Sequence, residues 1–313
     1  MRLISIDRTG FAAAALVTSG DDGAELVLPV IAAGNGTGTG STVPVSMNDL
    51  LDDWQFWSER LKAVHAEASP ESWRPITDFE VLAPVPHPRS VICIGLNYRD
   101  HATETGAPIP TQPVVFAKHR SSVVGSGTAV ELPGSSDEVD YEAELAVVIG
   151  RRVFEASPQE ALRAVAGYTV MNDVSARDWQ ARTSQWMTAK SFPTFGPMGP
   201  ALVTADELGD ARGLRIGLRV NGETLQDSST DEMIFGVAEL ISHLSQFWPV
   251  EPGDVIATGT PAGVGFTRTP PVFLRDGDEV EAFIEGIGVL RNPVASRAAR
   301  PASGAGALQG ARA

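Results

Sequence analysis

The chain has 313 residues, and its 24 Lys and Arg against 39 Asp and Glu give a formal net charge of −15 at pH 7. This balance argues against a nucleic-acid-binding protein and against docking on an anionic membrane, because both depend on clustered Lys and Arg. Hydrophobic residues make up 43% of the chain and charged residues 20%, as in globular proteins. The single cysteine, Cys93, excludes an intramolecular disulfide and a thiolate zinc site.

The start of the chain favours the cytoplasm as the compartment. Its longest apolar run, Phe11 to Val17, is far shorter than the ~20 residues of a membrane span. The first residues, MRLISIDRTG, also do not contain the apolar centre of a secretory signal. We therefore expect a cytoplasmic protein that has neither nucleic acid nor a membrane as its partner.

Residues 1–85 predict a small α+β domain. Strands are expected in residues 1–30, where LISI alternates, FAAAALV is apolar and SGDDG forms a turn before AELVLPV. Residues 32–45 predict a flexible loop, and apolar residues recur at helical spacing over residues 47–67. The proline-rich stretch that follows predicts a domain boundary near residues 75–88.

Residues 86–295 predict a β-dominated domain. Only three helices stand out, around Pro158–Val165, Ala176–Gln180 and Met233–Phe247, without the βαβ alternation of a doubly wound sheet. The expected fold class is therefore β-rich α+β. The last eighteen residues, 296–313, have low complexity and predict a disordered tail. The strand candidates are VICIGLNY, PVVFAK, ELAVVIG, GYTVMNDV, LRIGLRVNG, DVIATGT and EVEAFIEGIGVL.

Carboxylates gather around two of these strands. Side chains alternate along a strand, so Asp140, Glu142 and Glu144 share one face ahead of LAVVIG. They repel one another unless a positive charge lies between them. This segment alone fits either a hard divalent cation with oxygen ligands or a solvated strand edge that faces water. Asp173 follows the strand GYTVM and precedes ARDWQ, where it fits either a further ligand or a helix cap.

A histidine and a glutamate in NYRDHATETG form a candidate acid–base pair. Their spacing of three places His101 and Glu104 on one face of a helical turn, within reach of a hydrogen bond. Such a carboxylate raises the basicity of the other ring nitrogen, which suits a general base acting on water. An exposed loop histidine is the alternative.

Two glycine-rich segments complete the candidate set. Lys190 and Thr194 lie in AKSFPTFGPMGP, which predicts a loop without regular secondary structure. The lysine fits neutralisation of a carboxylate or of developing negative charge, or plain solvation. The turn GTPAGVG at 259–265 has amides that suit a carboxylate. It is neither a Walker loop nor a dinucleotide motif, since Gly-Lys-Ser/Thr and a βαβ context are both missing.

The order of these segments resembles the fumarylacetoacetate hydrolase (FAH) family. The resemblance covers about residues 88–292. It implies a fumarylacetoacetase C-terminal-like mixed β-sandwich roll, preceded here by a small N-terminal α+β domain, and a homodimer. The motifs that carry it are GLNYRDHATETG, DYEAELAVVIG, GYTVMNDVSARDWQ, KSFPTFGPMGP, VNGETLQDSSTDEMIFGVAELISHLSQ and GDVIATGTPAGVG.

The resemblance also implies roles for matching residues. The ligands it implies for Mg²⁺ or Mn²⁺ are Glu142, Glu144 and Asp173. The catalytic residues it implies are His101, Glu104 and Lys190. The substrate-binding residues it implies are Arg177, Gln180, Thr194, Gly259 and Thr260. The longer eukaryotic fumarylacetoacetases have an additional aspartate ligand where this chain has Asn97, which favours a substrate other than fumarylacetoacetate.

Together these expectations describe a metal-dependent hydrolase. It would cleave a carbon–carbon bond of an acylpyruvate-like 1,3-diketo acid to a carboxylic acid and pyruvate. An oxaloacetate-type decarboxylase or a 2-hydroxy-dienoate isomerase is the alternative, because the same enolate serves all three reactions. A further alternative is a non-catalytic, metal-dependent binding protein. Residues 102–112 and 183–195 are expected to contact the distal end of the 2-oxo or diketo acid, and they leave aromatic, sugar-derived and aliphatic groups open.

Overall fold

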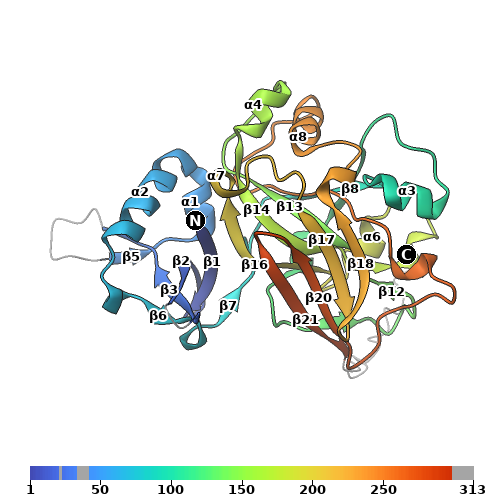
Figure 1. The fold of residues 1–313 in the computed structure, drawn as a ribbon, viewed down its shortest axis with the longest axis horizontal. Coiled ribbons are helices and arrows are strands. Elements are labelled where there is room, and N and C mark those ends of the chain that lie inside the picture. The colour runs from blue at the N-terminus through green and yellow to red at the C-terminus, as the bar shows by residue number, and fades with distance from the viewer. Residues whose placement is uncertain (21–22, 34–41, 298–313) are drawn as a thin grey trace, which may run out of the picture.

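The computed structural model describes residues 1–20, 23–33 and 42–297. Figure 1 shows a smaller lobe built from the first part of the chain, in blue, beside a larger, β-rich lobe. Of the predicted tail, only Ser296, which ends a strand, and Arg297 lie within the described residues. Residues 34–41 of the predicted loop lie outside them, and the flanks of this loop form an antiparallel pair, β4 (Ile31–Ala33) and β5 (Thr42–Pro44).

The helical part of the smaller lobe is divided in two. The backbone at Asp53, with φ −133° and ψ 56°, is not helical, so the helix predicted over residues 47–67 becomes α1 (Met47–Asp52) and α2 (Trp54–Glu67). Ser46 begins α1 in a capping box with Asp49. The side chains that these helices bury include Leu50, Leu51 and Leu61.

One twelve-stranded sheet runs through both lobes. Its first strands pair in chain order, as the alternating apolar residues predict, and β1 then pairs with β16 of the larger lobe. The predicted domain boundary therefore lies in the connection between lobes that share a sheet. Its strands are β1 (Arg2–Arg8), β2 (Phe11–Ser19), β3 (Glu25–Pro29), β6 (Arg74–Pro75), β7 (Val81–Leu82), β8 (Val91–Gly95), β9 (Val114–Lys118), β10 (Val123–Val124), β13 (Ala143–Ile149), β14 (Val165–Asn172), β16 (Gly196–Thr204) and β19 (Val255–Ala257).

A second, five-stranded sheet packs against the first in the larger lobe. Leu145 and Val147 of the first sheet share one hydrophobic core with Leu218 and Ala282 of the second. This arrangement confirms the predicted β-rich α+β sandwich roll (Figure 1). The second sheet contains β11 (Val130–Leu132), β17 (Arg215–Val220), β18 (Glu223–Ser229), β20 (Glu279–Ile284) and β21 (Gly288–Ser296), and a separate pair joins β12 (Val139–Asp140) to β15 (Ser175–Ala176).

The helices of the larger lobe are short. The three predicted ones are present with tighter bounds, and three more accompany them. Together they are α3 (Arg99–Thr105), α4 (Pro158–Leu162), α5 (Arg177–Gln180), α6 (Met187–Lys190), α7 (Ala205–Leu208) and α8 (Val237–Ser245).

The loop predicted for AKSFPTFGPMGP is wrong at both ends. The segment begins within α6, and its GPMGP part opens strand β16. Proline cannot donate to a sheet ladder, but Pro200 falls where the β14–β16 register shifts, between the partners of Tyr168 and Val170. Pro197 lies beyond the last β14–β16 partner pair, Met171 with Met198, so these prolines interrupt little of the ladder.

Candidate active site

Two neighbouring strands bring the three predicted metal ligands together. β13 and β14 are antiparallel, and Ala143 pairs with Asn172. Glu142 and Glu144 therefore flank the start of β13 at the place where Asp173 follows the end of β14. One carboxylate oxygen from each of the three residues lies within 4.8 Å of the others, and all three side chains are buried.

Asp140 lies outside this cluster. It accepts hydrogen bonds from Arg177 Nε at 2.8 Å and from the amide of Gly265 at 2.8 Å. β12 ends at Asp140 and β13 begins only at Ala143, so the single strand face predicted for the three acidic residues is not formed. Asp140 shares Arg177 with Glu142, which contacts another nitrogen of the same guanidinium. Its role in the structure is to hold Arg177.

Positive side chains from the protein itself contact two of the three carboxylates. Lys190 Nζ lies 2.7 Å from Glu142 Oε2 and 2.8 Å from Asp173 Oδ2, and Lys118 Nζ lies 2.5 Å from Asp173 Oδ1. Burial would raise the pKa of Glu142, but the charges of Lys190 and Arg177 lower it to about 2. Burial likewise would lower the pKa of Lys190, whereas Asp173 and Glu142 raise it above its usual range.

Glu144 is in a different electrostatic position. Its carboxylate accepts a hydrogen bond of 2.9 Å from the neutral amide of Gly259. Burial, followed by the charges of Asp173 and Glu142, raises the pKa of Glu144 well above its usual range. A buried set of three carboxylates with excess negative charge at one member fits a hard divalent cation with oxygen ligands.

The predicted acid–base pair is formed on α3. His101 Nδ1 lies 3.0 Å from Glu104 Oε2. The second oxygen of Glu104 accepts hydrogen bonds from the amide of Gly263 at 2.9 Å and from Thr267 Oγ1 at 2.8 Å. His101 is buried, which rules out the exposed loop histidine. With Nδ1 fixed by a carboxylate, Nε2 is the ring nitrogen that can exchange a proton with a ligand.

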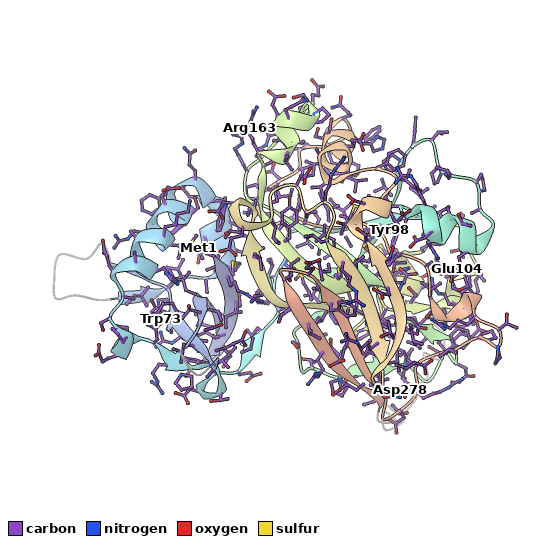
Figure 2. The ribbon with its side chains drawn as sticks, viewed as in Figure 1. Met1, Trp73, Tyr98, Glu104, Arg163 and Asp278 are labelled. Carbon is purple, nitrogen blue, oxygen red and sulfur yellow. The ribbon has the colours of Figure 1, made fainter. Side chains whose placement is uncertain are left out.

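Seven of the predicted site residues surround one cavity of about 620 Å³. This cavity lies over the carboxylate cluster in the larger lobe. Figure 2 labels Glu104 on α3, on the side of this lobe that faces away from the smaller lobe. The seven are His101, Glu142, Glu144, Arg177, Gln180, Lys190 and Thr260.

Two predicted substrate-binding residues have other contacts. Thr194 Oγ1 accepts a hydrogen bond of 2.7 Å from the amide of Glu131, so it joins two segments of backbone. Gly259 has φ +100°, and a Cβ there would lie 2.8 Å from Asn97 Cβ. Its amide is bound to Glu144, so in the structure Gly259 supports a carboxylate and does not offer a free donor.

Asn97 helps to hold the turn that contains Gly259. Its amide nitrogen donates to the carbonyl oxygens of Phe235 and Thr258, and its amide oxygen accepts from the backbone of Phe235. Asn97 thus fixes the strand end that precedes Gly259.

Lys118 and Gln226 take part in the site although no sequence motif indicated them, whereas Trp186 lies within residues 183–195, which were expected to contact the substrate. Lys118 ends a strand and neutralises Asp173, Gln226 holds Thr260 Oγ1 at 2.8 Å, and Trp186 forms part of the cavity wall. The signal for Lys118 was a charged residue at the end of the apolar run PVVFA, the same signal that identified Asp173. Gln226 contacts Thr260 across 34 positions of sequence, and local spacing contains no trace of such a contact.

The family model described as fumarylacetoacetate (FAA) hydrolase C-terminal matches residues 90–295. The chain belongs to the FAH family. This confirms the family resemblance seen in the six motifs. Within the family, the chain is 47% identical to the human mitochondrial oxaloacetate tautomerase FAHD2B over 256 residues, which are 81% of each protein.

Solved FAH-family structures are similar over nearly the whole chain. The fumarylacetoacetate hydrolase from Exiguobacterium antarcticum is 34% identical with a TM-score of 0.77, and the match covers 95% of this chain and 100% of that one. A 5-carboxymethyl-2-hydroxymuconate delta-isomerase from Mycobacterium smegmatis is 32% identical with a TM-score of 0.73 at the same coverages. These relatives are enzymes, and two of the three are named for rearranging a substrate.

The comparisons leave two expectations as predictions. The human relative is mitochondrial, so the cytoplasmic location of this FAH-family chain stays a prediction, as does the homodimer. Among the residues that the structure describes, none of the helices has the length and apolar character needed to cross a membrane.

Proposed function

We propose that this FAH-family protein is a divalent-metal-dependent tautomerase that interconverts the enol and keto forms of a 2-oxo acid, with oxaloacetate as its first test substrate. The observation that carries the proposal is the 47% identity to an oxaloacetate tautomerase over 81% of each chain. The tautomerase proposal takes the place of carbon–carbon hydrolysis, which the sequence motifs favoured. It is related to the alternative functions named above, decarboxylation and isomerisation, because they also pass through an enolate at this site.

The geometry suits a proton transfer at C3 of the substrate. His101 lines the cavity beside Glu142 and Glu144, and its Nδ1 is held by Glu104. Nε2 of His101 is therefore the atom that delivers a proton to C3 of the enol or removes it from C3 of the keto form. Glu104 stabilises the positive charge that the ring gains when it accepts the proton.

The remaining site residues hold the substrate and its charge. A cation held by Glu142, Glu144 and Asp173 would supply positive charge for the carboxylate and the 2-oxygen of the acid, and the oxygen-only ligand set suits Mg²⁺ or Mn²⁺. Lys190 adds a positive charge that favours the negatively charged 2-oxygen of the enolate over the uncharged 2-oxygen of the keto form. Arg177 and Gln180 are joined by a 2.9 Å hydrogen bond and line the cavity, and in this proposal they orient a second carboxylate of the substrate.

The test follows the ketonisation of freshly dissolved enol-oxaloacetate by the loss of its ultraviolet absorbance. We expect the purified protein with Mg²⁺ or Mn²⁺ to accelerate the reaction, EDTA to abolish the effect, and added metal to restore it. A parallel assay measures pyruvate released from acylpyruvates and from oxaloacetate. Pyruvate release without ketonisation would contradict the tautomerase and favour a hydrolase or a decarboxylase.

Hydrolysis of a diketo acid is the second candidate. It is favoured by the similarity to the Exiguobacterium hydrolase, which extends over 95% of this chain. The same pair, His101 and Glu104, would then activate water in place of C3. A tautomerase has to keep water away from the substrate carbonyl, so the two functions make opposite demands on one site.

A further inference from the structure

The cavity has an aromatic part that the proposed proton transfer does not use. Its rings are Phe116, Trp186, Phe266 and Phe273. Oxaloacetate has no apolar group to place against them. The volume of about 620 Å³ lies within the range of sites that hold ligands considerably larger than oxaloacetate.

The aromatic rings lie directly beside the charged groups of the site. Lys190 Nζ lies 5.2 Å from the centre of the Phe116 ring, and the guanidinium carbon of Arg177 lies 4.4 Å from the centre of the Phe266 ring. Trp186 packs edge-on against Phe116, with ring centres 5.3 Å apart. A 2-oxo acid bound at the carboxylates and Lys190 would therefore direct a substituent on C3 toward the rings.

Trp186 is not needed to fill a hydrophobic core. It is half-buried, and the other side chains of residues 181–188 are exposed. Its indole rests on Gly95 of β8, where a Cβ would lie 2.5 Å from Cζ3 of the ring. The apolar face that this indole exposes to the cavity is removed from water when a ligand covers it, and this burial favours ligands with an apolar group.

We propose that the site takes 2-oxo acids with an aromatic group on C3, and that Trp186 is the residue that selects for this group. The inference rests on the proposed function, which places the carboxylate and the 2-oxygen. An aromatic substituent can meet Trp186 and Phe116 edge-to-face, an arrangement that charged or short aliphatic substituents do not share.

The test compares two ligands that differ by one ring. Calorimetry measures the binding of phenylpyruvate and of pyruvate to the Mg²⁺-loaded protein. We expect wild type to bind phenylpyruvate at least about tenfold more tightly than pyruvate, as aromatic contacts and burial of the ring predict. Trp186→Ala should reduce this preference to about twofold or less. Phe247→Ala, which removes a 65% exposed ring outside the cavity lining, is the matched control and should retain the preference.

Gly95→Ala provides a second variant that retains every ring. Its methyl group has to displace the indole, so it should lose the preference as Trp186→Ala does. Thermal unfolding of each variant confirms that it is folded. Equal affinity for the two ligands in wild type, or a preference that survives in both cavity variants, would overturn the inference.

Binding separates this inference from the proposed function. A ring preference that depends on Trp186, in a protein that does not catalyse ketonisation, would contradict the tautomerase alone. Ketonisation of oxaloacetate without a ring preference would contradict the substrate class alone. Absence of binding by either acid would also contradict the substrate class, and the ketonisation assay would still decide the tautomerase independently.

Discussion

Lys118 and Lys190 both contact Asp173, and Lys190 also contacts Glu142, so the chain neutralises two of its three clustered carboxylates itself. The hydrogen bond to Glu144 comes instead from an uncharged backbone amide. Burial and the neighbouring carboxylates raise the pKa of Glu144, which marks it as the ligand that gains most from a divalent cation.

Replacing Glu144 by Gln should therefore have opposite effects with and without metal. It replaces a buried carboxyl group, whose ionised form the site disfavours, by a neutral amide that retains an oxygen able to accept from Gly259. We expect the metal-free variant to be more stable than wild type by an amount on the order of 1 kcal/mol, and its Mg²⁺ affinity to be at least about tenfold weaker. Thermal unfolding and calorimetry measure the two effects. Glu131→Gln, at a side chain that is 43% exposed, is the control. A destabilised metal-free Glu144→Gln would argue against this electrostatic account.

His101 is the residue on which the proton transfer depends. His101→Ala should lower kcat for ketonisation by about 10²–10⁴-fold, because it removes the general acid–base group. Its Mg²⁺ affinity should stay close to that of wild type, since the three carboxylates are intact. His87→Ala replaces an exposed histidine of the connector and should leave kcat unchanged. Wild-type turnover by His101→Ala would remove His101 from the mechanism.

The predictable residues of the site are those whose partners are near in sequence. The contact between His101 and Glu104 spans one helical turn, and the pair Glu142 and Glu144 follows from strand alternation. Lys118 reaches Asp173 across 55 positions of sequence, and neither residue reveals the other. Packing of the whole sheet decides such contacts, so sequence spacing could not predict them.

At the scale of elements, the turn after β19 (Val255–Ala257) links backbone geometry to the carboxylates. Gly259 adopts φ +100° against Asn97 and donates to Glu144, so the turn conformation and the ligand position depend on one residue. The strands on either side were predictable from their Val and Ile content. β16 was not, because its glycines and prolines have the composition of a loop and are accommodated at a register shift.

Gly259→Ala should therefore lower the unfolding free energy more than the same substitution at a comparable glycine. Gly277 is the matched control, because its φ of +87° is similar and a Cβ there would meet nothing within 4 Å. Both variants strain the backbone, by about 1 kcal/mol or more, but only Gly259→Ala adds a clash with Asn97. We expect a larger loss of unfolding free energy and weaker Mg²⁺ binding for Gly259→Ala. Equal stability losses with unchanged metal binding would contradict the role of this turn.

The molecule as a whole joins two lobes through one sheet and one core. Leu3 and Leu16 of the smaller lobe share a hydrophobic cluster with Met198 and Leu202 of β16 in the larger lobe. The change in composition near residues 75–88 predicts two domains, whereas the β1–β16 ladder ties them together. Only the pairing of strands distant in sequence reveals this, which is why local patterns could not.

This shared core predicts cooperative unfolding. Calorimetric unfolding of the whole chain should show one transition, and Leu202→Ala should lower the unfolding free energy by about 2–5 kcal/mol without separating the lobes. Two resolved transitions in the wild-type protein would show that the lobes unfold independently, as the predicted domain boundary implies.

The central claim is that His101 moves a proton at C3 of a 2-oxo acid with the help of a divalent cation. The most direct measurement is the exchange of the C3 protons of oxaloacetate for deuterium in heavy water, followed by NMR. Wild-type protein with Mg²⁺ should accelerate the exchange, and neither His101→Ala with Mg²⁺ nor wild type with EDTA should do so. Exchange no faster than in buffer, together with pyruvate release from an acylpyruvate, would contradict the tautomerase and establish a hydrolase instead.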